Sequence, residues 1–192
     1  SARNEHAMAY DSARSRVVLY GGVAGFANQA DTWEWDGGGW TQVALMGTTP
    51  PAYRGHAMAF DSTRNRTLLF GGGGGTATYQ TGTWEWDGAT WVSTGPVGSG
   101  PPRESSAMAF DSRRSRTVMF GGFLSLSGSM STLEDTLEWS GSGTWVPVAT
   151  TLTRPSPRRN HAMAYDSTRG KVMMFGGANG NSRISQTWEY GP

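Results

Sequence analysis

The chain has 192 residues and a formal net charge of +1, from 16 Lys and Arg against 15 Asp and Glu. This balance provides no positively charged face for nucleic acid, so no nucleic-acid partner is expected. The absence of cysteine excludes disulfides, thiol catalysis and cysteine-ligated zinc. No apolar run approaches the roughly 20 residues of a membrane helix, and no membrane contact is expected.

One sequence pattern occurs four times and divides the chain into units. Its copies begin at His6, His56, Ser106 and His161, and each is followed by a Trp-bearing segment. Repeats of roughly 50 residues are typical of solenoids, propellers and arrays. We predict a single domain, residues 1–192, with repeats at approximately 1–50, 51–100, 101–155 and 156–192.

Within the first unit, every segment has the pattern of a β-strand. The predicted strands are a at residues 7–10, b at residues 17–20, c at residues 32–35 and d from Trp40. Asp11 and Ser12 begin the a–b hairpin, where their side chains can bond the backbone. Asp36-Gly37 is a strong signal for the c–d turn. Strand b is apolar at consecutive positions, so both of its faces should be buried.

Four short antiparallel strands with two apolar faces describe a sheet packed between copies of itself. A radial stack of such sheets is a β-propeller. A β-solenoid is the alternative, but solenoids favour shorter repeats. We therefore predict an all-β propeller of four blades, whose last blade has three strands because no strand d follows Tyr190.

The repeated residues resemble those of the kelch family. Four hydrophobic residues precede Gly-Gly, and an aromatic residue and a Trp follow. The four units read VVLYGG with Trp35 and Trp40, TLLFGG with Trp86 and Trp91, TVMFGG with Trp139 and Trp145, and VMMFGG with Tyr190. The Trp-Glu-Trp form is similar to a variety in large bacterial surface and secreted proteins. The resemblance implies kelch-type blades and an extracellular or cell-surface location.

The number of units leaves the closure of the ring open, because kelch propellers commonly have six or seven blades. Three arrangements fit four units. They are a compact four-bladed ring, a half-ring that dimerises into eight blades, and part of a longer array. We prefer the closed four-bladed monomer over the dimer.

The connections between strands differ in how much they vary. The a–b hairpins are nearly constant, whereas the b–c loops and the Pro- and Gly-rich d–a linkers diverge. Because strands alternate in direction, these divergent connections share one face, here called the variable face, and binding is expected there. The b–c loops are residues 23–30, 73–81, 123–134 and 178–185. The predicted contact residues are Phe26, Tyr79, Phe123, Leu124, Leu126, Met130 and Arg183. Alternatively, these side chains fold back over the blade.

Histidines recur at the start of strand a, the innermost strand of a kelch blade. His6, His56 and His161, with Ser106 in the fourth place, would lie near the mouth of the central channel. Three histidines around one axis could bind a metal ion. We instead favour one structural hydrogen bond per blade, since Ser106 replaces a histidine, and predict no metal.

Arginines recur three residues before these positions. Arg3, Arg103 and Arg158 could form a cationic ring for an anionic ligand at the channel mouth. We favour a structural role in which each pairs with a glutamate of strand c, because a buried carboxylate needs a partner. Those glutamates are Glu34, Glu85, Glu138 and Glu189.

The sequence contains neither a G-x-S-x-G nor an H-E-x-x-H motif. We predict a non-enzymatic module without a cofactor that recognises a protein partner through the variable face. The alternative is a glycan-binding propeller in which exposed Trp or Tyr stack on sugar rings. A sugar-processing enzyme is less favoured, because it needs an asymmetric set of acids and bases whereas the polar residues here repeat.

Overall fold

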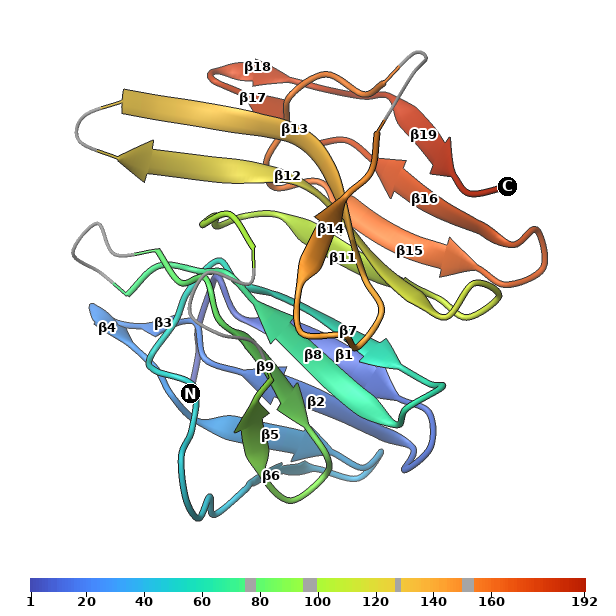
Figure 1. The fold of residues 1–192 in the computed structure, drawn as a ribbon. Helices are drawn as coiled ribbons and strands as arrows, with labels where there is room; N and C mark the ends of the chain where they lie inside the picture. Colours follow the sequence, from blue (N-terminus) through green and yellow to red (C-terminus); the bar gives the residue numbers. More distant parts are fainter. Residues whose placement is uncertain (75–78, 95–99, 127–128, 150–153) are drawn as a thin grey trace.

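The computed structural model describes residues 1–74, 79–94, 100–126, 129–149 and 154–192. These residues form short antiparallel strands arranged as blades of a β-propeller, and none of them is helical (Figure 1). No described element is therefore a helix that could cross a membrane.

Four sheets follow one another along the chain, as the repeats predict. Blade 1 contains β1 (Ala7–Asp11), β2 (Arg16–Tyr20), β5 (Thr32–Trp35) and β6 (Trp40–Gln42). Blade 2 contains β7 (Ala57–Asp61), β8 (Arg66–Phe70), β9 (Thr83–Trp86) and β10 (Trp91–Ser93). Blade 3 contains β11 (Ala107–Asp111), β12 (Arg116–Leu126), β13 (Ser129–Trp139) and β14 (Trp145–Pro147). Blade 4 contains β15 (Ala162–Asp166), β16 (Lys171–Phe175) and β19 (Thr187–Tyr190), which confirms a three-stranded last blade.

Two small hairpins stand apart from the blades, in the connections of blades 1 and 4. They are β3 (Val23–Ala24) with β4 (Ala27–Asn28), and β17 (Ala178–Asn179) with β18 (Ser182–Arg183). In blade 3 the same connection is instead an extension of β12 and β13 beyond the sheet, with a register shift between Phe120 and Gly122. Blades 1 and 4 therefore share one form of b–c connection, and blade 3 has another.

The hairpins between the first two strands are built by the repeated aspartate. The amides of Ala13 and Arg14 donate to Asp11 Oδ1 at 3.0 and 3.1 Å. Ser15 closes the turn with φ 54°, in the left-handed region. Short polar side chains favour turns by offering the backbone such local bonds. The same aspartate bonds recur in the other three blades, as predicted.

Each internal blade buries both faces, because successive residues of a strand point to opposite sides. In β2, Val18 and Tyr20 face blade 2 and are fully buried, while Leu19 faces the other side. The face toward the next blade is here called the forward face and the other the backward face. The forward face of blade 1 packs against Met58, Leu69 and the tryptophans of blade 2. The next two interfaces repeat this arrangement.

The preferred closed ring is not what the structure shows. The inner strands pack in the order β1, β7, β11 and β15, but β15 does not return to pack against β1 in the same way. In Figure 1 blade 1 (blue) and blade 4 (red) lie at opposite ends of the arc. The backward face of blade 1 and the forward face of blade 4 are consequently exposed. Met8 is 51% exposed and Phe175 is 58% exposed, whereas the equivalent Met58 and Phe70 are buried.

Candidate functional site: the variable face and the channel mouth

The residues just before the four inner strands form the mouth of the space between the blades. They surround a hollow of about 310 Å³. Its lining residues are Glu5, His6, Gly55, His56, Ser105, Ser106, Asn160 and His161. The structure thus brings the three histidines and Ser106 to one place, where the repeat predicts them.

A ladder of backbone hydrogen bonds joins the blades at this mouth. The amide of Gly55 donates to Glu5 O at 2.9 Å, that of Ser105 to Gly55 O at 2.6 Å, and that of Asn160 to Ser105 O at 2.9 Å. All four residues have φ between 54° and 62°, a region that residues with a Cβ rarely adopt. Such backbone persists only where its surroundings enforce it, and here the ladder does so.

The buried histidines are part of the blade interfaces. The His56 ring lies edge-on to the Tyr20 ring, and its Nε2 is 3.1 Å from Tyr20 O. Burial lowers the pKa of His56 to about 4, and burial together with the nearby Arg158 lowers the pKa of His161 to about 4. Both rings are therefore neutral near pH 7. Among the described residues, no group of three or more His, Asp or Glu side chains could hold a metal ion.

The arginines of the mouth do not pair with the strand glutamates, so that prediction is wrong. Arg3 instead binds Asp31 through both of its terminal nitrogens, at 2.7 and 2.9 Å, and holds the pKa of that carboxyl below its usual range. Arg103 binds Asp135 in the same way, and Arg158 donates to Gln186 Oε1 at 3.0 Å. Each acceptor stands immediately before the repeated threonine of the third strand, at the end of the blade where the arginines lie.

The strand glutamates bind a different arginine because they lie nearer the opposite end of the blade. Arg14, in the a–b hairpin, donates to Glu34 Oε1 and to Asp11 Oδ2, both at 2.7 Å. The other three blades repeat this Asp–Arg–Glu network around Arg64, Arg114 and Arg169. The repeated charges are thus neutralised within each blade, which leaves the variable connections to distinguish the copies.

A set of charged residues beside the mouth was not predicted from the sequence. Arg54 Nε lies 3.7 Å from Glu5 Oε2, Glu104 is partly buried, and the Arg159 guanidinium lies 4.6 Å from the centroid of the Phe123 ring. Burial raises the pKa of Glu104, against the opposing effect of nearby Arg54. A signal was present: the residue before each repeated His or Ser differs in all four copies, and the residue before that is Asn, Arg, Glu and Arg in turn.

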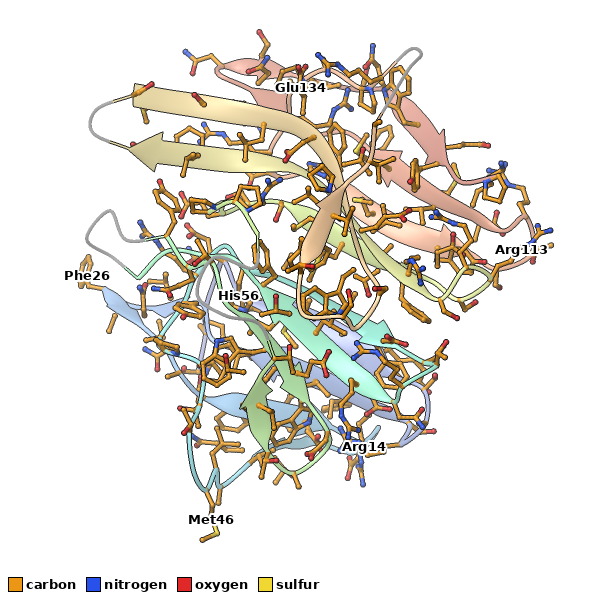
Figure 2. The ribbon with its side chains drawn as sticks, in the orientation of Figure 1. Arg14, Phe26, Met46, His56, Arg113 and Glu134 are labelled. Atoms are coloured by element: carbon orange, nitrogen blue, oxygen red, sulfur yellow. The ribbon has the colours of Figure 1, made fainter. Side chains whose placement is uncertain are left out.

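Three of the predicted contact residues are freely exposed on the b–c connections. Phe26, in the turn between β3 and β4, is 109% exposed, and Met130 of β13 is 72% exposed. Arg183 of β18 is also exposed. Figure 2 shows Phe26 pointing away from the body of the protein, on the side opposite Arg113 of the a–b hairpin.

The remaining predicted contact residues fold back toward the protein to different extents. Phe123 is 8% exposed beneath Arg159, so its ring is not available at the surface. Tyr79 and Leu124 are partly buried, and the Tyr79 hydroxyl accepts a hydrogen bond from the Ser125 amide at 3.1 Å. The side chain of Leu126 lies outside the described part of the structure.

The sheets, their order and the divergent connections define a repeat-built β-propeller with one constant and one variable face. The family model of the KLHDC2/KLHL20/DRC7 Kelch-repeats domain matches residues 31–192, most of the chain. The chain therefore belongs to the kelch-repeat family, whose propellers commonly mediate protein–protein interactions. A search of curated proteins gave no match.

Proposed function

We propose that the chain is a non-enzymatic binding module and that a protein partner contacts its variable face. The observation that carries the proposal is the full exposure of large apolar side chains on connections that differ among the copies. Phe26 and Met130 are the two clearest cases. An exposed apolar side chain on a rigid scaffold is a common anchor of an interface.

The channel mouth supports the same proposal. Glu5, Arg54, Glu104 and Arg159 place charges of both signs around the hollow beside these connections. Protein interfaces combine apolar anchors with a polar and charged surround. A partner with complementary charges would therefore gain both orientation and specificity on this face.

The longest of the connections is held in place before any partner binds. In this hairpin, residues 122–126 of β12 pair with residues 129–133 of β13. The hydrogen bond from the Ser125 amide to Tyr79 ties them to the b–c connection of blade 2. Preorganised loops lose less conformational entropy on binding, so this hairpin is well suited to an interface.

Site-specific photo-crosslinking tests the proposal. A photoreactive phenylalanine analogue replaces Phe26 or Met130, and the matched control replaces Arg113, which is exposed on the opposite face. We expect positions 26 and 130 to yield an adduct with the same protein and position 113 to yield none. Adducts from position 113 alone, or none from the variable face, would contradict the proposal.

The alternative of glycan binding rests on exposed aromatic residues. Trp40 is 43% exposed and Tyr10 is 58% exposed, both on the backward face of blade 1. In blade 2 the equivalent Trp91 is covered by blade 1, so the exposure of Trp40 follows from the missing neighbour rather than from a sugar site. Specific binding on a glycan array that includes anionic sugars, lost in Trp40→Ala, would instead support the lectin function.

We propose that the two exposed blade faces pair with those of a second copy. At the internal interface, Trp91 Nε1 donates to Thr32 Oγ1 at 2.9 Å. Trp40 on blade 1 and Thr187 on blade 4 are the equivalent donor and acceptor, each without a neighbouring blade. Light scattering tests this: a mass of twice 20.6 kDa fits an eight-bladed pair, and a mass of 20.6 kDa rules it out.

A further inference from the structure

An aspartate holds the turn between the third and fourth strands of blade 1. This turn, residues 36–39, joins β5 to β6. Asp36 Oδ1 accepts hydrogen bonds from the amides of Gly38 and Gly39 at 2.8 and 3.0 Å. Asp36 Oδ2 lies 3.1 Å from Nη1 of Arg16, the residue opposite it on β2. Two amides and one arginine therefore share a single carboxylate group.

Blade 2 repeats this arrangement with Asp87. Its Oδ1 accepts from the amides of Ala89 and Thr90, both at 2.8 Å, and Arg66 stands opposite it on β8. Burial raises the pKa of Asp87, but the amide hydrogen bonds and the charge of Arg66 together hold that pKa below its usual range. Because the turn stabilises the charged form of the carboxyl, it is a suitable site for one anionic group.

In blade 3 the arginine and the turn are present, but the carboxylate is not. Ser140 stands opposite Arg116, and the turn continues through residues 141–144, one residue longer than in the other two blades. The Ser140 hydroxyl lies 2.9 Å from that of Ser142 and does not bond the turn amides. Among the described residues, no acceptor bonds the amides of Ser142 and Gly143, which stand where the aspartate binds in blades 1 and 2.

Arg116 has no acidic partner in the described part of the chain. Its Nη1 donates to the carbonyl of the adjoining Ser115 at 3.0 Å. The two carboxylates of this blade that lie nearest, Asp111 and Glu138, are both bound by Arg114. None of the remaining residues of the sequence, 75–78, 95–99, 127–128 and 150–153, is acidic. This end of blade 3 therefore has a positive charge that no carboxylate of the chain neutralises.

The backbone of this turn is also suited to an anion. Gly141 and Gly143 have φ of 87° and 90°, whereas Ser142 between them has no positive φ. Backbone that alternates in this way can point successive amides toward one anion. The Arg64 guanidinium of blade 2, although paired within its own network, lies against Gly141, where a Cβ would come within 2.9 Å of Arg64 Nη1. A second cation thus borders the turn.

We propose that the turn of residues 140–144, together with Arg116, binds the carboxylate group of a small free acid. This carboxylate takes the place that the aspartates fill in blades 1 and 2. One of its oxygens accepts from the amides of Ser142 and Gly143, and the other faces Arg116. Hydrogen bonds that involve charged groups are about twice as strong as those between neutral groups, which favours an ionised ligand here.

A small acid is favoured over a protein because of the composition of the turn. Its sequence is Ser-Gly-Ser-Gly-Thr, so it offers no apolar side chain as an anchor for a protein interface. The turn also lies at the end of the blade opposite the variable face. The proposal is therefore independent of the proposed protein-binding function.

A titration of the whole chain with sodium acetate tests the proposal. Acetate replaces chloride at constant ionic strength, and the backbone amide shifts are followed by NMR. We expect saturable shifts at Ser142 and Gly143, with half-saturation on the order of 10 mM for one exposed carboxylate. The amides of Gly38 and Ala89 are internal controls, because their turns already hold an aspartate. Equal shifts in all three turns would overturn the proposal.

Two arginine variants test the contribution of the guanidinium. Arg116→Gln removes the positive charge and should weaken acetate binding at least about fivefold, as expected for the loss of a hydrogen bond to a charged group. Arg66→Gln is the matched control, since its turn is filled by Asp87, and it should leave the acetate affinity unchanged. Equal effects of the two variants would contradict the role of Arg116.

Exchanging serine and aspartate between two blades tests the site in both directions. Ser140→Asp supplies the carboxylate from within the chain, so it should abolish the acetate shifts and raise the Tm by about 2–4 °C. Asp87→Ser empties the turn of blade 2, so it should lower the Tm and create acetate-dependent shifts at Ala89 and Thr90. Acetate binding that persists in Ser140→Asp, or that does not appear in Asp87→Ser, would overturn the proposal.

Two further ligands decide the nature of the bound group. Inorganic phosphate should bind no more tightly than acetate, and tighter binding of phosphate would contradict the assignment to a carboxylate. The blocked peptide acetyl-Gly-Gly-Asp-Gly-Gly-amide carries one carboxylate on a protein-like backbone and should also bind no more tightly than acetate. Binding of this peptide at least about tenfold tighter than acetate would contradict the assignment to a free acid.

Discussion

The two blades at the ends of the arc have aromatic residues at the same repeat positions as the two internal blades, but these side chains are buried to different extents. Trp91 is 3% exposed, whereas Trp40, at the same position of blade 1, is 43% exposed. Phe70 is fully buried, whereas Phe175 of blade 4 is 58% exposed. In a repeat protein, stability is divided between each unit and its contacts with neighbours. The exposure of an aromatic side chain on an end blade is therefore explained by the absence of a neighbouring blade, and it is not by itself evidence for a binding site.

The largest expected difference is between the two equivalent tryptophans. Trp91→Ala should lower the free energy of unfolding by about 3–5 kcal/mol, because it empties a buried site and leaves Thr32 without its donor. Trp40→Ala should cost only about 1 kcal/mol, because its ring is already partly in water. Urea unfolding followed by circular dichroism measures both. Similar losses for the two variants would mean that blade 1 is covered in solution.

The burial of two histidines predicts the next largest effect, which is a fall in the free energy of unfolding at low pH. His56 and His161 have a pKa of about 4 when folded and about 6.5 when unfolded. The unfolded chain binds more protons between these values, so stability is complete above about pH 6.5 and falls as the pH drops toward 4. The shift corresponds to about 3 kcal/mol per histidine. Asp31, whose pKa lies below its ordinary 3.8, responds only at lower pH.

Serine variants isolate that histidine effect, since Ser106 stands at this position in blade 3. The double variant His56→Ser and His161→Ser should flatten the fall in the free energy of unfolding between pH 6.5 and 4. His6→Ser should keep most of it, because His6 is only partly buried at the end of the arc. An unchanged slope in the double variant would show that other groups set the pH dependence.

The Asp–Arg–Glu networks should show a smaller contrast. Arg64→Met leaves the buried Asp61 and Glu85 carboxylates without a partner and should cost about 2 kcal/mol, since the arginine itself is partly exposed. In blade 4, Arg169→Met should cost no more than about 0.5 kcal/mol, because Arg169 and Glu189 are nearly half exposed. Thermal unfolding of the two variants measures the contrast, and equal losses would contradict it.

The smallest effect on stability is expected at the variable face. Phe26→Ala and Met130→Ala should change the free energy of unfolding by no more than about 0.5 kcal/mol, because neither side chain is packed. The same variants should weaken a partner identified by crosslinking. A large loss of stability in either variant would place that side chain in the core and remove it from the proposed interface.

Much of the fold follows from the sequence because its signals are local and repeated. The consecutive apolar residues of strand b predict burial on both faces, and Leu68 with Leu69 in the internal blade 2 confirms it. The repeated Asp-Ser predicts the hairpins, and Asp11 forms them.

The pairing of side chains between strands was less predictable, because it depends on position along the blade. Arg3 was expected to bind a glutamate of strand c, but it lies at the other end of that strand and binds Asp31. The prediction of a closed ring was wrong for a related reason, since the angle between neighbouring blades cannot be derived from the sequence of any single repeat. The burial of Phe123 depends on Arg159, a residue of the next blade, and no spacing within one loop could have shown it.

Phe120, Thr136 and Tyr190 of the interface between blades 3 and 4 stand where the other two interfaces hold Trp91 and Trp145, so the same indole site is expected there. Replacing Gly191 and Pro192 by Asp-Gly-Ala-Thr-Trp-Val-Ser-Thr would provide the fourth strand in the register of blade 2. Calorimetry should show a Tm about 4–8 °C above that of the same tail with Ala in place of Trp, as expected for about 2 kcal/mol in a chain of this size. Equal Tm values for the two tails would contradict the presence of an indole site in this interface.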